Sequence, residues 1–474
     1  MTHTTPNGRE VLSMAVMHYF GAFLILVLVF MVGLYSGRKV KSASDFSSGG
    51  HKAGAGIVAG TIIGTLVGGA STIGTAQLAF NYGMSAWWFT LGGGIGCVVL
   101  TLFYIKPLYA SNISTLPQIF AREYGHRTST AATLLTSMGS FLSIVSQVLS
   151  GVALITTVSR LPGMPATMII VLLMLCYVVF GGVWGAGYVG IVKTVLLCVA
   201  VGGCGIYAVI LQGGLHSFAA RLPQTQYFNL FARGVIIDAG AGLSLVLGML
   251  TTQAYIQAVV SAKTLKLSKL GTMMSAFLIP LIGIGGILVG MYMKLNYPDI
   301  APETALPLFI MEKVPSLPGG MILATLLVAL VGTGAGVSLG LSSMLSNDIY
   351  KVYINRNPSD ERSLVVSRII IVMVLAAAVL LSSGNIGSLI LGWSFLSMGL
   401  RGAVAFGPLC TALFLPGRIP SRYAFASMIV GPALVLIGKF VLPASIDPLF
   451  LGVAGNISVL AVGFIAGKKQ PRTA

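Results

Sequence analysis

The sequence predicts an all-α polytopic membrane protein with about 13 transmembrane helices. Of its 474 residues, 56% are hydrophobic and only 8% are charged, and the mean hydropathy is +0.93. A soluble domain carries about 25% charged residues, so this composition indicates a chain that lies mostly in lipid. Its apolar runs are long enough to cross a bilayer, which takes about 20 residues in a helix.

The expected spans form a single transmembrane domain, residues 1–474, and no soluble segment is long enough for a second domain. They lie at about 16–36, 56–80, 84–106, 130–157, 164–182, 188–212, 235–260, 270–294, 318–346, 365–383, 387–414, 422–442 and 449–467. The first run is long enough to be a permanent span and not a cleaved signal peptide. The five cysteines lie inside apolar runs without metal-ligand spacing, so we expect neither a metal site nor disulfides there.

Basic residues are distributed unequally between the two sides of the membrane. With the N-terminus outside, most of the 28 lysines and arginines fall in loops that face the cytoplasm. The positive-inside rule therefore predicts an N-out/C-in topology and an odd number of spans. The net charge of +17 reflects this orientation, so we expect the lipid bilayer as a partner and no nucleic acid. No obligatory protein partner is evident.

The second expected span contains glycines that indicate a broken helix. Gly64, Gly68 and Gly69 lie near its middle, and each interior glycine costs about 1 kcal/mol relative to alanine. Unwound backbone at membrane depth is tolerated only where it is buried in protein or lines a cavity. In secondary transporters the freed carbonyls of such a break bind a cation. The alternative is a packing face of small residues, as in the GxxxG motif.

Four motifs, in the same order along the chain, resemble those of the sodium:solute symporter family. They are SASDFSSGG at 42–50, TTQAYIQAVVSAKTLKLSK at 251–269, SSMLSNDIYK at 342–351 and RGAVAFGPL at 401–409. This family includes proline, sialic acid, pantothenate and sugar transporters. The resemblance implies the leucine-transporter-type fold, with inverted five-helix repeats at 56–212 and 235–414 and additional helices in 415–474.

The same resemblance implies one sodium ion between the break in the second span and the ninth span. Carried over to this chain, its ligands are the carbonyls of Gly64, Val67 and Ala329 and the hydroxyl of Thr333. The family normally has two adjacent hydroxyls at this point, and here Gly332 replaces one of them. The loss weakens the implied site, although water or a nearby serine could supply the missing oxygen.

The sixth span departs further from the family pattern. The family usually has an aspartate followed three residues later by a glutamine, and this chain has Gly190 and Lys193 at those positions. A lysine near mid-membrane costs roughly 3 kcal/mol or more unless it is paired or wetted. In one interpretation Lys193 lies near the cytoplasmic end and extends its amine to water. In the other its ammonium occupies the sodium position, as in some transporters of the wider fold, and coupling shifts to protons or is lost.

Substrate contacts are expected beside the break and on the opposite repeat. The candidates are Ser71, Thr72, Gln77, Gln253, Gln257 and Arg401. Arg401 lies well inside the eleventh span, where an arginine usually faces the interior or a wet cavity. Its guanidinium suits a carboxylate, so a carboxylate or amino acid substrate is expected. The alternative is a structural pair of Arg401 with Asp238 or with backbone carbonyls at a helix end.

These features predict a secondary active transporter of the cytoplasmic membrane that imports a small organic solute with sodium. A proton-coupled or uncoupled transporter, with Lys193 in place of sodium, is the alternative. We expect no enzyme and no cofactor besides the coupling ion, since no catalytic motif or phosphate-binding loop occurs. A channel is a weaker alternative, because no segment resembling a selectivity filter repeats along the chain.

Overall fold

The computed structural model describes residues 3–4, 10–11, 15–37, 53–111, 115–181, 188–356 and 358–467. Within these ranges the regular structure is helical, apart from one antiparallel pair of two-residue strands, β1 (His3–Thr4) and β2 (Glu10–Val11), and a single bridge between Ala53 and Ala262. The expected all-α class is therefore confirmed for the described residues. The first family-like motif, at 42–50, lies outside them.

Ten of the described helices are long and uninterrupted. The uninterrupted ones are α1 (Val16–Gly37), α8 (His126–Ser159), α9 (Gly163–Gly181), α10 (Tyr188–Gln212), α15 (Leu265–Asn296), α17 (Ser316–Leu345), α18 (Asp360–Ser383), α19 (Ile390–Phe414), α20 (Ser421–Val441) and α21 (Pro448–Ala466). Polar side chains cap the first turn of some of these helices. At the start of α15, for example, the Thr264 hydroxyl accepts a hydrogen bond from the N–H of Leu267.

The remaining helical segments are shorter, and several of them follow one another as parts of one expected span. They are α3 (Ala55–Leu66), η2 (Ala70–Gly74), α4 (Thr75–Tyr82), η3 (Gly83–Trp87), α5 (Trp88–Val99), η4 (Leu100–Tyr104), α6 (Ile105–Ala110), α7 (Leu116–Tyr124), α11 (Leu215–Arg221), α12 (Gln224–Tyr227), α13 (Val235–Thr251), α14 (Gln253–Val260), η6 (Pro302–Thr304), α16 (Ala305–Lys313) and η7 (Ser346–Ile354).

Helical segments occupy most of each of the thirteen ranges expected to span the membrane. By length and hydropathy, nine helices of the described chain suffice to cross a bilayer, or up to ten if a bent pair is counted as one span. Three further apolar helices are shorter than this test requires. The polytopic membrane class is thus supported, and the count of 13 crossings stays a prediction.

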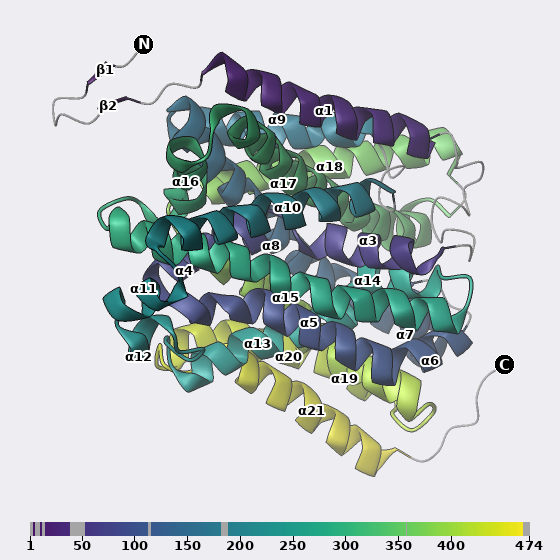
Figure 1. The fold of residues 1–474 in the computed structure, drawn as a ribbon. Helices are drawn as coiled ribbons and strands as arrows, with labels where there is room; N and C mark the ends of the chain where they lie inside the picture. The colour runs from purple at the N-terminus through teal and green to yellow at the C-terminus, as the bar shows by residue number, and fades with distance from the viewer. Residues whose placement is uncertain are drawn as a thin grey trace.

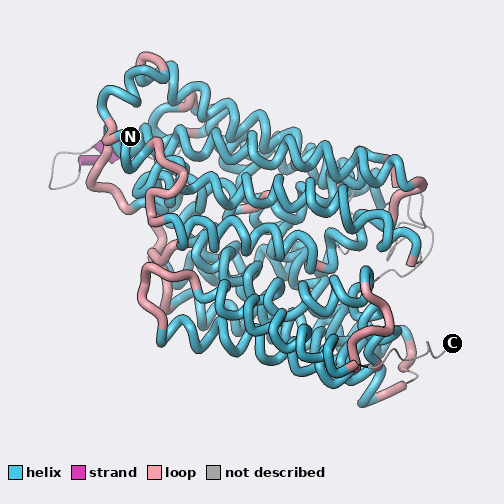
Figure 2. The backbone as a smooth tube through the Cα atoms, turned by 90° about the horizontal axis from the view of Figure 1, so that it is seen from below, coloured by secondary structure: helices cyan, strands magenta, loops and turns pink. Residues whose placement is uncertain are grey.

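The long helices run side by side in one bundle, with the loops gathered at its two ends (Figures 1 and 2). Helix α1 packs along α17 at one edge, and α20 packs on α21 at the opposite edge (Figure 1). The start of α1 and the end of α21 lie at opposite ends of the bundle (Figure 1), as an odd number of crossings requires. Which end faces the cytoplasm remains a prediction from the basic loops.

The break expected in the second span is present. Helix α3 ends at Leu66, and Val67 is extended, with φ −85° and ψ 99°. A Cβ added to Gly68 would lie only 2.6 Å from Oε1 of Gln147 and 2.8 Å from Oγ1 of Thr333. The glycine therefore lets side chains of α8 and α17 reach the unwound backbone.

A second break divides the expected seventh span, and the sequence analysis did not predict it. Helices α13 and α14 meet at Thr252, where φ is −88° and ψ is 124°, and their axes differ by 51°. No glycine or proline stands at this point, since the local sequence is Met249-Leu250-Thr251-Thr252-Gln253. A search for helix breaks by their glycines therefore could not find it.

Candidate cation site

Helices α3 and α10 cross closely through their glycines. A Cβ on Gly190 would lie 2.5 Å from the carbonyl oxygen of Gly60, and a Cβ on Gly64 would lie 3.1 Å from Cα of Gly190. An aspartate at position 190, as the family usually has, does not fit this contact. Lys193 follows Gly190 by about one helical turn on α10 and so faces the same stretch of α3.

The amine of Lys193 reaches the end of α3 just before the break. Its Nζ donates to the carbonyl oxygen of Gly64 at 2.7 Å and to Oγ1 of Thr333, on α17, at 2.5 Å. The Thr333 hydroxyl in turn lies 3.3 Å from the Gly64 carbonyl, to which it donates. One ammonium thus joins three helices, α3, α10 and α17, at two of the oxygens expected to bind sodium.

Lys193 is only 6% exposed. The interpretation that it extends its amine to water at a membrane surface is therefore wrong for this structure. The close α3–α10 crossing directs the side chain inward instead, where a carbonyl and a hydroxyl replace water as acceptors. Charge-assisted hydrogen bonds of this kind are shorter and about twice as strong as neutral ones.

The other expected sodium ligands lie around the same point. Val67 and Ala329 are fully buried, and Ala329 precedes Thr333 by one turn of α17. Among the described hydrogen bonds, Lys193 donates to neither of their carbonyls. At Gly332, a Cβ would lie 3.7 Å from Oη of Tyr177, so a Cβ fits there at ordinary contact distance.

The backbone of the first break is held by polar side chains. Ser71 and Thr72, expected to contact substrate, each donate a hydroxyl hydrogen to the Gly68 carbonyl, at 3.0 and 2.9 Å. The Ser71 oxygen also accepts from the Gly68 N–H at 2.9 Å. Gln147 accepts from the Gly69 N–H at 2.8 Å through its Oε1. The sequence analysis did not select Gln147, although an amide inside the apolar run of the fourth span was a usable signal.

Two of the three glutamines expected to contact substrate hold backbone groups of neighbouring elements. Gln77 donates to the Ser388 carbonyl at 3.1 Å and accepts from the Ile390 N–H at 2.9 Å, so it joins α4 to the start of α19. Gln253 accepts from the N–H of Leu116 at 2.7 Å. Gln257 lies one turn further along α14 and is half-buried. The structure thus gives Gln77 and Gln253 positioning contacts, and their role toward substrate stays a prediction.

Arg401 lies at the second break and is only 4% exposed. Its Nη1 donates to Oγ1 of Thr252 at 2.9 Å, and its Nη2 donates to Oγ of Ser397 at 2.9 Å. Its Nε donates to the Ser397 carbonyl at 3.2 Å, which lies inside α19 and not at a helix end as the alternative expected. The alternative pairing with Asp238 is wrong, because that carboxylate lies 2.6 Å from Nη2 of Arg233 instead.

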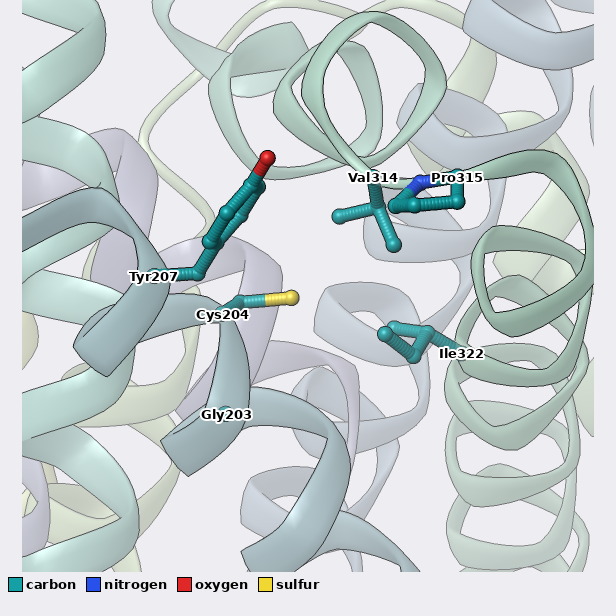
Figure 3. Close-up of a pocket in the computed structure, with 6 residues that line it drawn as sticks. All are labelled: Gly203, Cys204, Tyr207, Val314, Pro315 and Ile322. Carbon is teal, nitrogen blue, oxygen red and sulfur yellow. The ribbon is translucent and has the colours of Figure 1, made fainter. Parts of the chain in front are cut away.

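A cavity of about 180 Å³ lies elsewhere in the bundle, between α10 and the α16–α17 turn. Cys204 and Tyr207 face Val314 and Ile322 across it (Figure 3). These α10 residues follow Lys193 by more than ten positions, which is about 15 Å or more along a helix. The cavity is therefore separate from the lysine site.

Comparisons with known proteins agree with the motifs in the sequence. The model of the sodium:solute symporter family matches residues 46–431. A sodium/sialic acid symporter of Proteus mirabilis is 23% identical, over 94% of both chains. A high-affinity choline transporter of Torpedo marmorata is 24% identical, over 83% of this chain and 72% of that protein. An osmoregulated proline transporter of Bacillus subtilis is 23% identical, over 90% and 89%.

Solved structures show the same fold. A Na⁺-coupled sialic acid symporter in a substrate-bound, outward-open state has a TM-score of 0.78 to this chain, at 20% identity over 97% of this chain and 100% of that one. A nucleobase-cation-symport-1 family transporter has a TM-score of 0.57 at 15% identity, over 90% and 95%. The apolar helix bundle and these likenesses define a polytopic membrane transporter and not an enzyme. The chain belongs to the sodium:solute symporter family and has the leucine-transporter-type fold.

Proposed function

We propose that this protein is a secondary active importer of a small organic solute in the cytoplasmic membrane, in which the Lys193 ammonium replaces the bound sodium ion. The observation that carries the proposal is the pair of contacts from Nζ to the Gly64 carbonyl and the Thr333 hydroxyl, at 2.7 and 2.5 Å. Two monovalent cations at one pair of oxygens repel each other strongly in a low-dielectric interior. Sodium therefore binds there only if Lys193 leaves or loses its proton.

The lysine supplies a way to couple transport to protons. A charged amine joins α3, α10 and α17, and a neutral amine loses the charge-assisted part of those hydrogen bonds, which are worth about 1.5–3 kcal/mol each. Protonation then stabilises the arrangement in which the three helices are joined, as sodium does in a sodium-coupled relative. If the Lys193 amine never releases its proton, it joins the three helices permanently and transport is uncoupled.

Sodium coupling is the second candidate, and family membership favours it. Sodium coupling requires the Lys193 amine to move away from the Gly64 carbonyl and the Thr333 hydroxyl. These two oxygens can then form a sodium site together with the carbonyls of Val67 and Ala329. The missing hydroxyl at Gly332 makes this site poorer in oxygen ligands than the family pattern.

The proposed solute is a carboxylate or an amino acid. The support for this class is the Arg401 guanidinium, which is buried at the second break and hydrogen-bonds hydroxyls, a carbonyl and a thioether, but no carboxylate of the described chain. Relatives named for sialic acid and proline carry substrates with a carboxylate. Choline, for which another relative is named, does not.

Uptake into proteoliposomes tests the proposal. A panel of radiolabelled carboxylates and amino acids would be offered under an inward proton gradient or an inward sodium gradient. We expect accumulation with the proton gradient, no change when potassium replaces sodium, and loss of proton-driven accumulation in Lys193→Arg, since arginine does not discharge. Accumulation that needs sodium and ignores the proton gradient would contradict the replacement of sodium by Lys193. Equilibration without accumulation under either gradient would indicate uncoupled transport.

A further inference from the structure

Each of the two broken helices is contacted at or near its break by a buried cationic side chain. At the first break, the buried cation of Lys193 binds the Gly64 carbonyl at the end of α3. At the second break, the buried cation of Arg401 binds the Thr252 hydroxyl between α13 and α14. Buried charges are rare in membrane spans, because each costs roughly 3 kcal/mol or more to place there. Two such charges, each directed at a helix break, call for a common explanation.

The helices around the two cations correspond in position. On the repeat boundaries expected from the family, Lys193 lies on the fifth helix of the first repeat and binds the broken first helix of that repeat. Arg401 lies on the fifth helix of the second repeat, α19, and binds the broken first helix of its own repeat. The two sites correspond helix by helix but not residue by residue. Lys193 binds Gly64, three residues before the first break at Val67, whereas Arg401 binds Thr252, at the second break itself.

The third helix of the opposite repeat completes each site. Thr333, on α17, accepts from Lys193. At the other site α8 supplies Gly139, and a Cβ there would lie 2.7 Å from Cγ of Arg401. The Ser397 hydroxyl, which accepts from Arg401, donates to the Gly139 carbonyl at 2.6 Å. Each cation therefore sits where the broken helix, the fifth helix and the third helix of the other repeat meet.

We propose that Arg401 is a positioning residue for the second break, and that it corresponds to Lys193 at the first. Its guanidinium holds the α13–α14 junction against α19 through Thr252, while its stem packs on α8. Arginine keeps its charge in proteins, whereas lysine can release a proton. The second break is thus held by a fixed cation, whichever ion drives transport at the first.

Hydrogen–deuterium exchange of the full-length protein in lipid nanodiscs tests this without a substrate. Arg401→Met keeps most of the stem but removes the charge and the donors. We expect it to speed exchange of the amides at 253–256 by about tenfold or more, the factor given by losing one charge-assisted hydrogen bond. Exchange at 67–70 should stay within about twofold. Lys193→Met should give the reverse pattern, and Arg401→Lys should restore part of the protection at 253–256.

Three results would overturn the proposal: unchanged exchange at 253–256 in Arg401→Met, equal loosening of both breaks, or no difference between Arg401→Met and Arg401→Lys. Equal loosening would make Arg401 a support of the whole bundle, and equal behaviour of the two variants would assign its role to shape. If Arg401→Met does not fold, Thr252→Val and Thr252→Ser decide the question. Only valine removes the acceptor, so only Thr252→Val should loosen the second break.

Discussion

Nζ of Lys193 lies 2.5 Å from Oγ1 of Thr333, so an ammonium on α10 is bound directly by a hydroxyl on α17. The same hydroxyl donates to the Gly64 carbonyl, which also accepts from Nζ. The three groups form a closed triangle in which each donor meets an acceptor. The resemblance to the family implies that oxygens at this place hold sodium, and here Lys193 donates to two of those oxygens.

Gly190 allows this contact, and its replacement should disturb it. In Gly190→Ala the new Cβ would lie 2.5 Å from the Gly60 carbonyl, so α3 and α10 must separate. We expect a destabilisation of about 1–3 kcal/mol, as for overpacked interiors, measured by thermal or denaturant unfolding. Gly202→Ala on the same helix is the matched control, because a Cβ there meets nothing within 4 Å. That variant should be neutral or more stable by up to about 1 kcal/mol, and equal losses in both would contradict the close crossing.

Gln147 should be important for the stability of the first break. Its Oε1 accepts from the buried N–H of Gly69 at 2.8 Å. Gln147→Leu leaves that N–H without an acceptor, which costs about 1–3 kcal/mol. Unfolding experiments should show this loss, whereas Gln224→Leu, at an exposed position on α12, should change stability by less than about 0.5 kcal/mol. A Gln147→Leu protein as stable as the wild type would show that the break does not need this side chain.

Asp447, at the start of α21 and outside the spans, should make stability depend on pH. Burial raises the pKa of its carboxyl, against the smaller lowering effects of the Leu449 N–H and of Arg233. The folded protein thus holds this proton more tightly than the unfolded chain, whose aspartate pKa is about 3.9. The stability gained is present below that value and is lost as pH rises through the raised pKa.

Asp447→Asn keeps an acceptor for the Leu449 N–H, now 2.9 Å from Oδ1, and removes the titration. The melting temperature of the wild type relative to this variant should therefore fall as pH rises from 4 to 7. Parallel melting curves of the two proteins over that range would contradict the raised pKa.

Several features of this fold could be predicted from the sequence, and others could not. Hydropathy predicted the ranges of the helices, and the glycines at 64, 68 and 69 predicted the first break. Both features could be predicted because they depend on local composition. The second break could not be predicted, since Thr252 is held in its extended conformation by packing and by Arg401, which is distant in sequence.

The direction in which individual side chains point also could not be predicted from the sequence. Lys193 could have pointed to water or to the sodium position, and the choice depends on the α3–α10 crossing, a property of the packed bundle. Likewise the sequence did not predict that the amide of Gln77 joins Ile390 and Ser388, whatever its role toward substrate. Long-range partners such as Asp238 with Ser85, whose hydroxyl donates to Oδ1 at 2.7 Å, follow from how the helices pack, which periodicity does not report.

Gly332→Ser should improve any sodium site that forms. The serine would restore the second hydroxyl, and its Cβ fits at ordinary contact distance, 3.7 Å from Oη of Tyr177. In the wild-type background we expect no sodium response, since Lys193 still holds the oxygens. Combined with Lys193→Gln, the change should tighten sodium binding about tenfold, equivalent to about 1.4 kcal/mol, as measured by titration of the melting temperature with NaCl. Equal sodium affinity with and without Gly332→Ser would contradict a ligand role for that position.

The measurement that tests the central claim most directly is thermal unfolding in NaCl against KCl at matched ionic strength, for the wild type and Lys193→Gln. A ligand that binds only the folded state stabilises it by about 2.7 kcal/mol at a hundredfold excess over its Kd. If Lys193 occupies the cation position, the wild type will melt at the same temperature in both salts. Lys193→Gln, with the residue usual in the family, will melt higher in sodium. A sodium-specific rise in the wild type, or none in either protein, would contradict the claim.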